Sequence, residues 1–190
     1  MELNQEEKNR KEEEQKEQLI QELGNYLYQE KRKKGYIELV FLCIGTDRIT
    51  GDCFGPLVGS KLEEKLEHYN IFNINIFGTL KENVCYTNIK EVLKTIEIKH
   101  PNACLIVIDA ALAVQEKIGN IIVRKEKMTL GKGLNKAKIE IGDISIKAVV
   151  GKNYKLPKYN FSHLQNISLN VVNTMANIVA EAITEVIKYV

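Results

Sequence analysis

The sequence predicts an α/β fold in which helices cover both faces of a mostly parallel sheet, a three-layer α/β/α arrangement. Between residues 37 and 108, apolar runs typical of buried strands alternate with one-sided helical stripes. The resulting β-α-β-α-β order implies parallel strands joined by right-handed crossovers. Hydrophobic residues make up 44% of the 190-residue chain, which is enough to form a core between such layers.

Three strands and two helices are expected in the first half of the folded unit. The strands are predicted at residues 37–44, 71–77 and 103–108, and the second helix at 87–97. The first helix begins near Pro56, because proline lacks the N–H that would be unpaired in a first helical turn. The one-sided apolar stripe of this helix consists of Val58, Leu62, Leu66 and Tyr69.

The second half begins with extended segments and ends with a long helix. Strands are predicted at residues 117–123, 139–141 and 144–150, and a loop at 151–160. A strong amphipathic stripe from Ile167 to Val186 then predicts the C-terminal helix.

Residues 1–35 differ in composition from the rest and are expected to form a charged helical extension of a domain at 36–190. Half of residues 1–34 are charged, with both signs mixed. One apolar stripe runs through Leu19/Ile20, Leu23 and Tyr26/Leu27. This helix is expected to pack onto the domain or onto a second subunit. A homodimer through it or through the last helix is therefore an open alternative.

Composition argues against several classes of partner. The chain has 27 basic and 25 acidic residues, a net charge of +2, so no strong field favours nucleic acid. No apolar run approaches the roughly 20 residues that a membrane helix needs, and the charged N-terminus has no signal-peptide core. The sequence thus predicts a cytoplasmic protein with no membrane partner.

Of the four cysteines, Cys43 and Cys104 are expected to be buried thiols, whereas the roles of Cys53 and Cys85 stay open. None has C-x-x-C spacing, which disfavours zinc, and Cys43 and Cys104 fall in apolar strands of a protein from a reducing compartment. Cys53 adjoins Asp52, and a neighbouring carboxylate raises the pKa of a thiol, which argues against a reactive thiolate.

Two aspartates, Asp52 and Asp109, are the main candidates for a functional site. Each follows an apolar strand, and the carboxyl ends of the strands border the ligand crevice in open α/β sheets. The rival motifs are absent: there is no phosphate loop, no G-x-S-x-G elbow and no H-E-x-x-H. A close carboxylate pair can do acid–base chemistry, because one pKa rises and that group keeps a proton.

Other readings of these carboxylates stay open. Asp52 could cap the following helix, and Asp109 could accept backbone N–H bonds from the next loop. The pair could also bind a divalent metal with a third ligand from Asp143 or His163. Asp47 lies in the same loop as Asp52 and could either enter the pocket or serve the turn.

Several short stretches, in this order, resemble the YyaC-type sporulation protein family of spore-forming Firmicutes. The first and most specific block is Ile44–Arg48 followed by Gly51–Pro56. The resemblance covers residues 37–188. The remaining blocks are Gly78–Leu80, Ile108–Ala110, Gly142–Ile146 and Leu164–Asn166.

That family is distantly similar to the spore germination protease and to hydrogenase-maturation endopeptidases (HybD-like), which share an α/β/α fold of phosphorylase/hydrolase type. The germination protease carries an acid before a small-apolar-Gly-Pro sequence, as Asp52 does here, and a second in an Asp-Ala pair, as in Asp109-Ala110. The resemblance implies that these two acids hydrolyse peptide bonds without metal. The maturation enzymes add a metal-binding histidine with no clear match here, and their G-x-G-N start is replaced by Gly45-Thr46-Asp47.

The resemblance implies a sporulation-associated endopeptidase of aspartic type that needs no cofactor and acts in the cytoplasm of the forespore or mother cell. Asp52 and Asp109 would be catalytic, with Asp47, Asp143 and His163 as substrate-binding candidates and no metal ligand. The partner would be a protein or peptide substrate, with spore proteins as candidates. Two alternatives are kept: a non-catalytic binding protein of the same fold, and a metal-dependent maturation endopeptidase.

Overall fold

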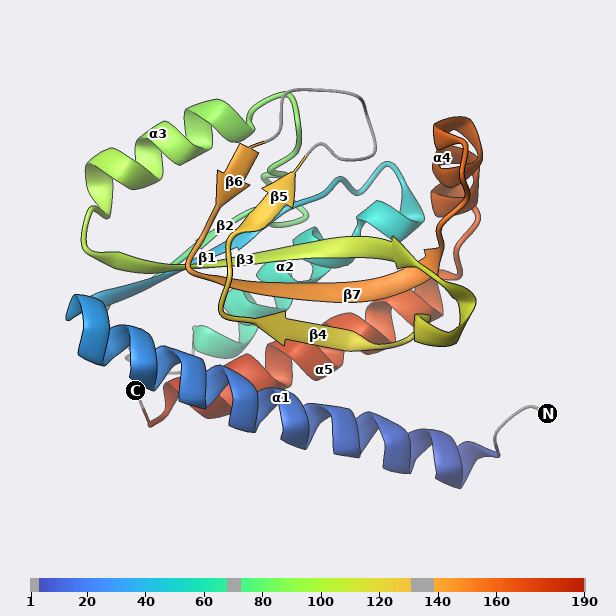
Figure 1. The fold of residues 1–190 in the computed structure, drawn as a ribbon, viewed down its shortest axis with the longest axis horizontal. Coiled ribbons are helices and arrows are strands. Elements are labelled where there is room, and N and C mark those ends of the chain that lie inside the picture. Colours follow the sequence, from blue (N-terminus) through green and yellow to red (C-terminus); the bar gives the residue numbers. More distant parts are fainter. Residues whose placement is uncertain (1–3, 68–72, 131–138, 190) are drawn as a thin grey trace.

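A computed structural model describes residues 4–67, 73–130 and 139–189, and its centre is a five-stranded sheet (Figure 1). The strand order is β2-β1-β3-β7-β4. The first four strands are parallel and β4 runs antiparallel to β7, so the expected mostly parallel sheet is confirmed. The strands are β1 (Glu38–Cys43), β2 (Ile74–Phe77), β3 (Ala103–Ala113), β4 (Ile121–Arg124) and β7 (Ile144–Lys152).

Layers of secondary structure cover both faces of the sheet, which confirms the α/β/α fold class. On one face lie α1 (Gln5–Lys34), α2 (Phe54–Leu66) and α5 (Leu169–Ile187). The other face carries α3 (Ile89–Lys99) and a small hairpin (Figure 1). The hairpin strands are β5 (Met128–Leu130) and β6 (Ile139–Ile141), and the short helices are η1 (Thr50–Asp52), η2 (Gln115–Lys117) and α4 (Pro157–Gln165).

Alternation along the strands divides the core into two layers. Phe41 and Ile106 face the α2 and α5 side, whereas Val40, Leu42 and Val107 face the α3 side. All five side chains are fully buried. Continuous apolar runs such as residues 37–44 are therefore explained by burial on both faces of a parallel sheet.

Helix α1 packs onto its own domain, which was one of the two expected placements. Leu19, Leu23 and Leu27 are buried in the core shared with α5. Its N-terminus is closed by a capping box, in which Asn4 and Glu7 satisfy each other's backbone N–H groups. None of the helices within the described residues is long and apolar enough to cross a membrane.

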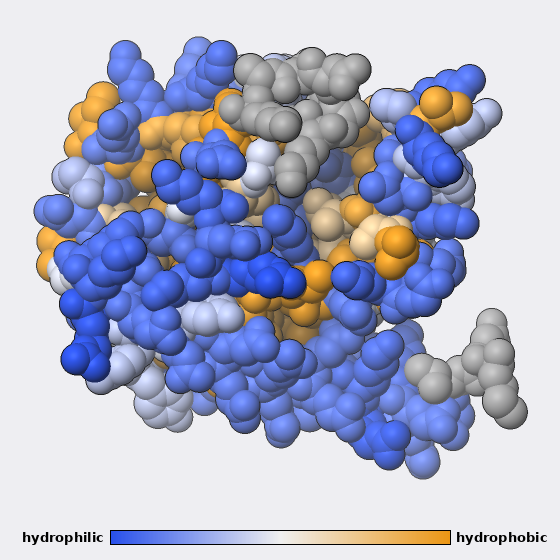
Figure 2. Space-filling model, viewed as in Figure 1, coloured by the Kyte–Doolittle hydropathy of each residue, from blue (hydrophilic) through white to orange (hydrophobic). Residues whose placement is uncertain are grey.

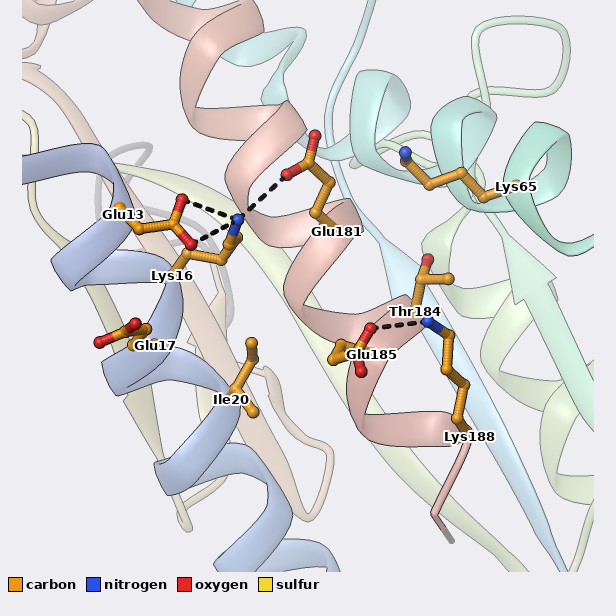
Figure 3. Close-up of a pocket in the computed structure, with 9 residues that line it drawn as sticks. All are labelled: Glu13, Lys16, Glu17, Ile20, Lys65, Glu181, Thr184, Glu185 and Lys188. Carbon is orange, nitrogen blue, oxygen red and sulfur yellow. Dashed lines mark hydrogen bonds and ion pairs between the residues drawn. The ribbon is translucent and has the colours of Figure 1, made fainter. Parts of the chain in front are cut away.

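A groove of about 680 Å³ lies where α1 and α5 approach α2 (Figure 3). Lys16 of α1 contacts one acid on its own helix and one on α5. Its Nζ lies 2.8 Å from Glu13 Oε1 and 3.7 Å from Glu181 Oε2. Lys188 is paired with Glu185 at 2.6 Å. Of these pairs only Lys16–Glu181 joins α1 to α5. The groove lies apart from the aspartates considered below.

Several predicted boundaries were wrong. Strand β3 runs to Ala113 instead of ending at residue 108, because β7 continues beside it as far as the Ala113–Lys152 pair. Strand β4 starts at Ile121, since η2 and Gly119, whose φ is +87°, occupy the segment before it. Helix α4 and strand β5 were missed. Tyr69, residues 71–72 of the expected strand and Gly131–Gly133 lie outside the described residues.

Candidate active site at the carboxyl ends of the strands

The place predicted for the ligand crevice is where β1 ends and β3 continues past it. Cys43, the last residue of β1, pairs with Ile108, and the N–H of Ile44 donates to the Ile108 carbonyl at 2.7 Å. Asp109 is the next residue of β3, and beyond this point β3 is paired with β7. Asp109 thus lies within a strand and not at its end, but it comes directly after the last pair with β1.

The chain leaving β1 turns back at once and brings Asp52 to this place. Gly45 has φ +144°, and a Cβ there would lie 1.9 Å from the carbonyl oxygen of Asp52. The N–H of Thr46 donates to that same carbonyl at 3.1 Å. Helix α2 then starts directly against β1, because Gly55 allows an approach in which a Cβ would be 2.1 Å from the Ile44 carbonyl oxygen.

Both carboxyl groups of this crevice bind protons more tightly than free aspartate. Burial raises the pKa of Asp52 to about 6, against the opposing effect of a backbone hydrogen bond from Thr46. Burial, and then the negative charge of Asp52, raise the pKa of Asp109 well above its usual range. The two groups therefore influence each other, and a shared crevice resists a second negative charge.

Lys147 is a charged group of this crevice that the sequence analysis missed. It lies opposite Asp109 in the β3–β7 register, so both side chains are on the α3 side of the sheet. Its positive charge, together with a backbone hydrogen bond from Ala110, lowers the pKa of Asp109 and limits the rise caused by burial. A single lysine inside the apolar run 144–150 was the available signal.

Asp47 lies on the same loop as Asp52 but is exposed. Its Oδ1 accepts a hydrogen bond from Asn83 Nδ2 at 2.7 Å. A backbone bond from Gly45 to the Val84 carbonyl, 2.8 Å long, joins the same two loops. Asp47 therefore links the β1–α2 loop to the β2–α3 loop, at the end of the sheet that carries Asp52.

His163 also lies at the carboxyl end of the sheet, on α4. Its Nε2 accepts the N–H of Lys152 at 3.1 Å, and its ring meets Tyr154 edge-on at 5.4 Å. Leu164, the next residue, contacts Gly51 of η1 so closely that a Cβ on this glycine would be 2.7 Å from its Cδ2. Helix α4 thus covers the turn that holds Asp52.

The structure separates Asp143 from the other candidates. Asp143 precedes β7, so it lies at the amino end of the sheet. Its Oδ2 accepts the N–H of Leu105 at 3.1 Å, and its other oxygen pairs with Lys34 at the end of α1. Asp143 therefore fastens α1 to the sheet at the end opposite Asp52 and Asp109.

The described residues do not fit a metal centre at this crevice. No three His, Cys, Asp or Glu side chains within that part of the chain converge as ligands, and Nε2 of His163 is occupied by a backbone N–H. The Cys53 thiol is also not activated. Burial, followed by the charges of Asp47 and Asp52, raises its pKa.

The solved structures that match this chain include two hydrogenase maturation proteases. HycI from Thermococcus kodakarensis matches with a TM-score of 0.55 and 21% identity, over 81% of this chain and 94% of that one. HybD from Thermococcus kodakarensis matches with a TM-score of 0.43 and 14% identity, over 79% and 99% of the two chains. The likeness to HycI supports the α/β/α fold of this chain.

The chain belongs to the family described as "Protein of unknown function (DUF1256)", whose model matches residues 8–182. It is 34% identical over 153 residues to the "Uncharacterized protein YyaC" of Bacillus subtilis (strain 168). That match covers 80% of this chain and 71% of the Bacillus protein. The resemblance to the YyaC-type family is thus confirmed.

Proposed function

We propose that this protein is an endopeptidase that hydrolyses peptide bonds of a protein substrate with Asp52 and Asp109. The observation that carries the proposal is the pair itself. Two carboxyl groups from different segments are near enough for the charge of Asp52 to raise the pKa of Asp109, and burial raises the pKa of both. Perturbed acids in a crevice are candidates for acid–base chemistry. The peptidase-like fold supports the same reaction class without fixing the chemistry.

In this mechanism the pair carries one proton. The ionised carboxylate accepts a proton from a water molecule as the water oxygen attacks the scissile carbonyl carbon. The protonated carboxyl donates a hydrogen bond and then its proton to the carbonyl oxygen, giving a neutral tetrahedral intermediate. The C–N bond breaks when the amide nitrogen takes a proton from the carboxyl that accepted one from water, while the other carboxylate removes a proton from a hydroxyl of the intermediate. The carboxylic acid and amine products leave, and the pair again carries one proton. The two roles belong to the coupled pair rather than to either residue.

The remaining candidate residues divide by position. Asp47 and His163 lie at the same end of the sheet as the pair, so we assign them to the surroundings in which substrate is held. Asp143 belongs to the opposite end, where its partners are Lys34 and the Leu105 N–H. We therefore leave it out of the proposed substrate site.

The biological setting of the proposal is spore formation or germination. The support is the resemblance to the YyaC-type family of spore-forming bacteria, to which the match with the Bacillus subtilis protein corresponds. Proteins of the spore are the substrates to test first, and the cytoplasm of the forespore or mother cell is the proposed place of action.

The test compares wild type with Asp52→Asn and Asp109→Asn on an extract of spore proteins. We expect wild type to shorten one or more proteins, as seen by intact-mass spectrometry, and each Asn variant to cleave at least ~100-fold more slowly because proton transfer is lost. Glu64→Gln, a neutral change at an exposed position on α2, is the matched control and should cleave like wild type.

Absence of cleavage in any extract, with all variants folded, would overturn the enzymatic proposal. A protein of this fold that binds substrate through the crevice without cutting it would then be the better description. In that case the Asn variants should change binding but leave every partner protein at its original mass.

A further inference from the structure

Helix α4 displays large apolar side chains that the fold does not bury. None of its nine residues is buried, although it carries Tyr159 and Phe161, both 52% exposed. Leu156, just before the helix, is 50% exposed. The helix is held in place from one side, where Leu164 packs against the core and η1. Core packing therefore explains its position but not the chemistry of its outer surface.

The region of the chain around α4 has a positive net charge. Residues 144–180 contain four lysines and no Asp or Glu, in a chain with almost equal numbers of acidic and basic residues. Lys152 Nζ lies 5.5 Å from the ring centre of Tyr154, and Lys158 Nζ lies 5.1 Å from that of Tyr159. Lys155 is exposed between them. We call Tyr154, Lys155, Leu156, Lys158, Tyr159 and Phe161 the α4 patch.

Two grooves border the α4 patch, and one of them reaches the end of β3. One, of about 440 Å³, is lined by Tyr154, Tyr159 and His163. The other, of about 420 Å³, shares Tyr154 and reaches Ala113 at the end of β3. Ala113 is four residues beyond Asp109, roughly 13 Å along an extended strand. A bound segment of a few residues can thus extend from the patch to the crevice.

Apolar and hydrophilic side chains are mixed on the part of the surface where α4 lies, at the upper right of the view in Figure 2. Such a mixture of exposed aromatic, aliphatic and cationic groups is typical of protein-binding surfaces rather than of a solvated helix. The lysines select negative charge, and Leu156 and Phe161 offer apolar contacts.

We propose that the α4 patch docks an acidic segment of the substrate protein, one in which Asp or Glu alternates with large apolar residues. This inference rests on the proposed peptidase function, because it places the docked segment next to the bond to be cut. A polypeptide is favoured over nucleic acid because exposed aliphatic and aromatic anchors accompany the cations, and because the chain as a whole carries a net charge of only +2.

The test measures fluorescence anisotropy with three labelled probes of equal length. They are a peptide of Glu, Asp, Leu and Phe, a peptide in which Lys replaces its acids, and a single-stranded oligonucleotide. The acidic peptide should bind most tightly to the full-length protein and should weaken as salt is raised. Lys155→Glu/Lys158→Glu should weaken it by about tenfold, and Tyr159→Ala/Phe161→Ala should weaken it at any salt concentration.

The matched control is Lys90→Glu/Lys94→Glu, the same charge change at two exposed positions of α3. It should leave binding of the acidic peptide unchanged. Equal loss in the control, or tighter binding of the basic peptide or the oligonucleotide, would overturn the proposal.

Failure of docking and failure of the proposed activity are distinguishable. The acidic peptide should bind Asp52→Asn and Asp109→Asn as it binds wild type, since neither residue belongs to the patch. Cleavage that depends on the aspartates but not on Lys155 and Lys158 would disprove docking alone. Binding that depends on the lysines in a protein without cleavage would disprove the activity alone.

Discussion

At the scale of single residues, Asp52 couples protonation to stability. Burial raises its pKa from 3.8 to about 6 in the folded protein, so the folded state binds this proton more tightly than the unfolded chain. The protonated Asp52 carboxyl therefore makes its full contribution to stability below pH 3.8, the pKa of the unfolded chain. This contribution is lost as pH rises through about 6.

Asp52→Asn is therefore expected to raise the free energy of unfolding at pH 7 by up to roughly 3 kcal/mol, and to have little effect near pH 4. Urea unfolding at both pH values measures the difference. A gain that is the same at both pH values would mean that the ionisation of Asp52 does not oppose folding. Glu64→Gln should show neither effect.

Lys147 allows a second prediction, on the pKa of Asp109. Its charge lowers that pKa, so Lys147→Met should raise the pKa of Asp109 further, whereas Lys147→Arg should leave it close to its wild-type value. A pH titration of ¹³C-labelled aspartate carboxyls by NMR reports the change directly. An unchanged pKa in the Met variant would show that Lys147 acts only in packing.

The catalytic role of Asp52 and Asp109 stays a prediction. Their position past the end of β1 followed from chain direction, although Asp109 lies within β3 and not at its end as expected. The same rule, applied to Asp143, puts it at the opposite end, since it precedes strand 144–150 instead of following it. Lys147 was missed because the sequence does not show which residue of the neighbouring strand it faces. Only the strand register places it opposite Asp109.

At the scale of elements, α1 contributes to the core through one narrow stripe. Leu23 is fully buried against α5, so Leu23→Ala should lower the free energy of unfolding by about 2–5 kcal/mol. Gln21→Ala, two residues away and exposed, should change it little. Thermal or urea unfolding of both variants tests this, and equal small effects would mean that α1 is a detachable arm.

The start of α2 makes a matched prediction for glycine. A Cβ on Gly55 would meet the Ile44 carbonyl oxygen at 2.1 Å, whereas a Cβ on Gly24 would meet nothing within 4 Å. Gly55→Ala should therefore destabilise the protein by about 1–3 kcal/mol and displace Asp52, while Gly24→Ala in mid-helix should stabilise it by about 0.5–1 kcal/mol. Urea unfolding measures both, and stabilisation by Gly55→Ala would contradict the close approach.

The sequence predicted the bounds of helices and strands where apolar periodicity is uninterrupted. It missed them where contacts with a neighbouring strand or helix determine where an element ends. The extension of β3 to Ala113 depends on its neighbour β7, which is not visible in the local pattern. Helix α4 has no buried residue, so its sequence has no apolar stripe that would predict a helix.

At the scale of the whole molecule, right-handed crossovers predicted the parallel core but not the full strand order. Strand β7 lies between β3 and β4, although β4 precedes it in the chain. The chain forms the edge strand β4 and the separate β5–β6 hairpin first, and β7 then pairs between β3 and β4. The fold class therefore follows from pattern, whereas this insertion required the structure.

The pairing of α1 with α5 has a consequence for synthesis. Lys16 and Glu181 are 3.7 Å apart in space and 165 residues apart in the chain. At about 5–20 residues per second, a ribosome needs roughly 8–33 s to make the intervening segment. During that time α1 has no partner helix, and its mixed charges keep it in water. Helix α1 therefore reaches its place against α5 only after α5 has also been made.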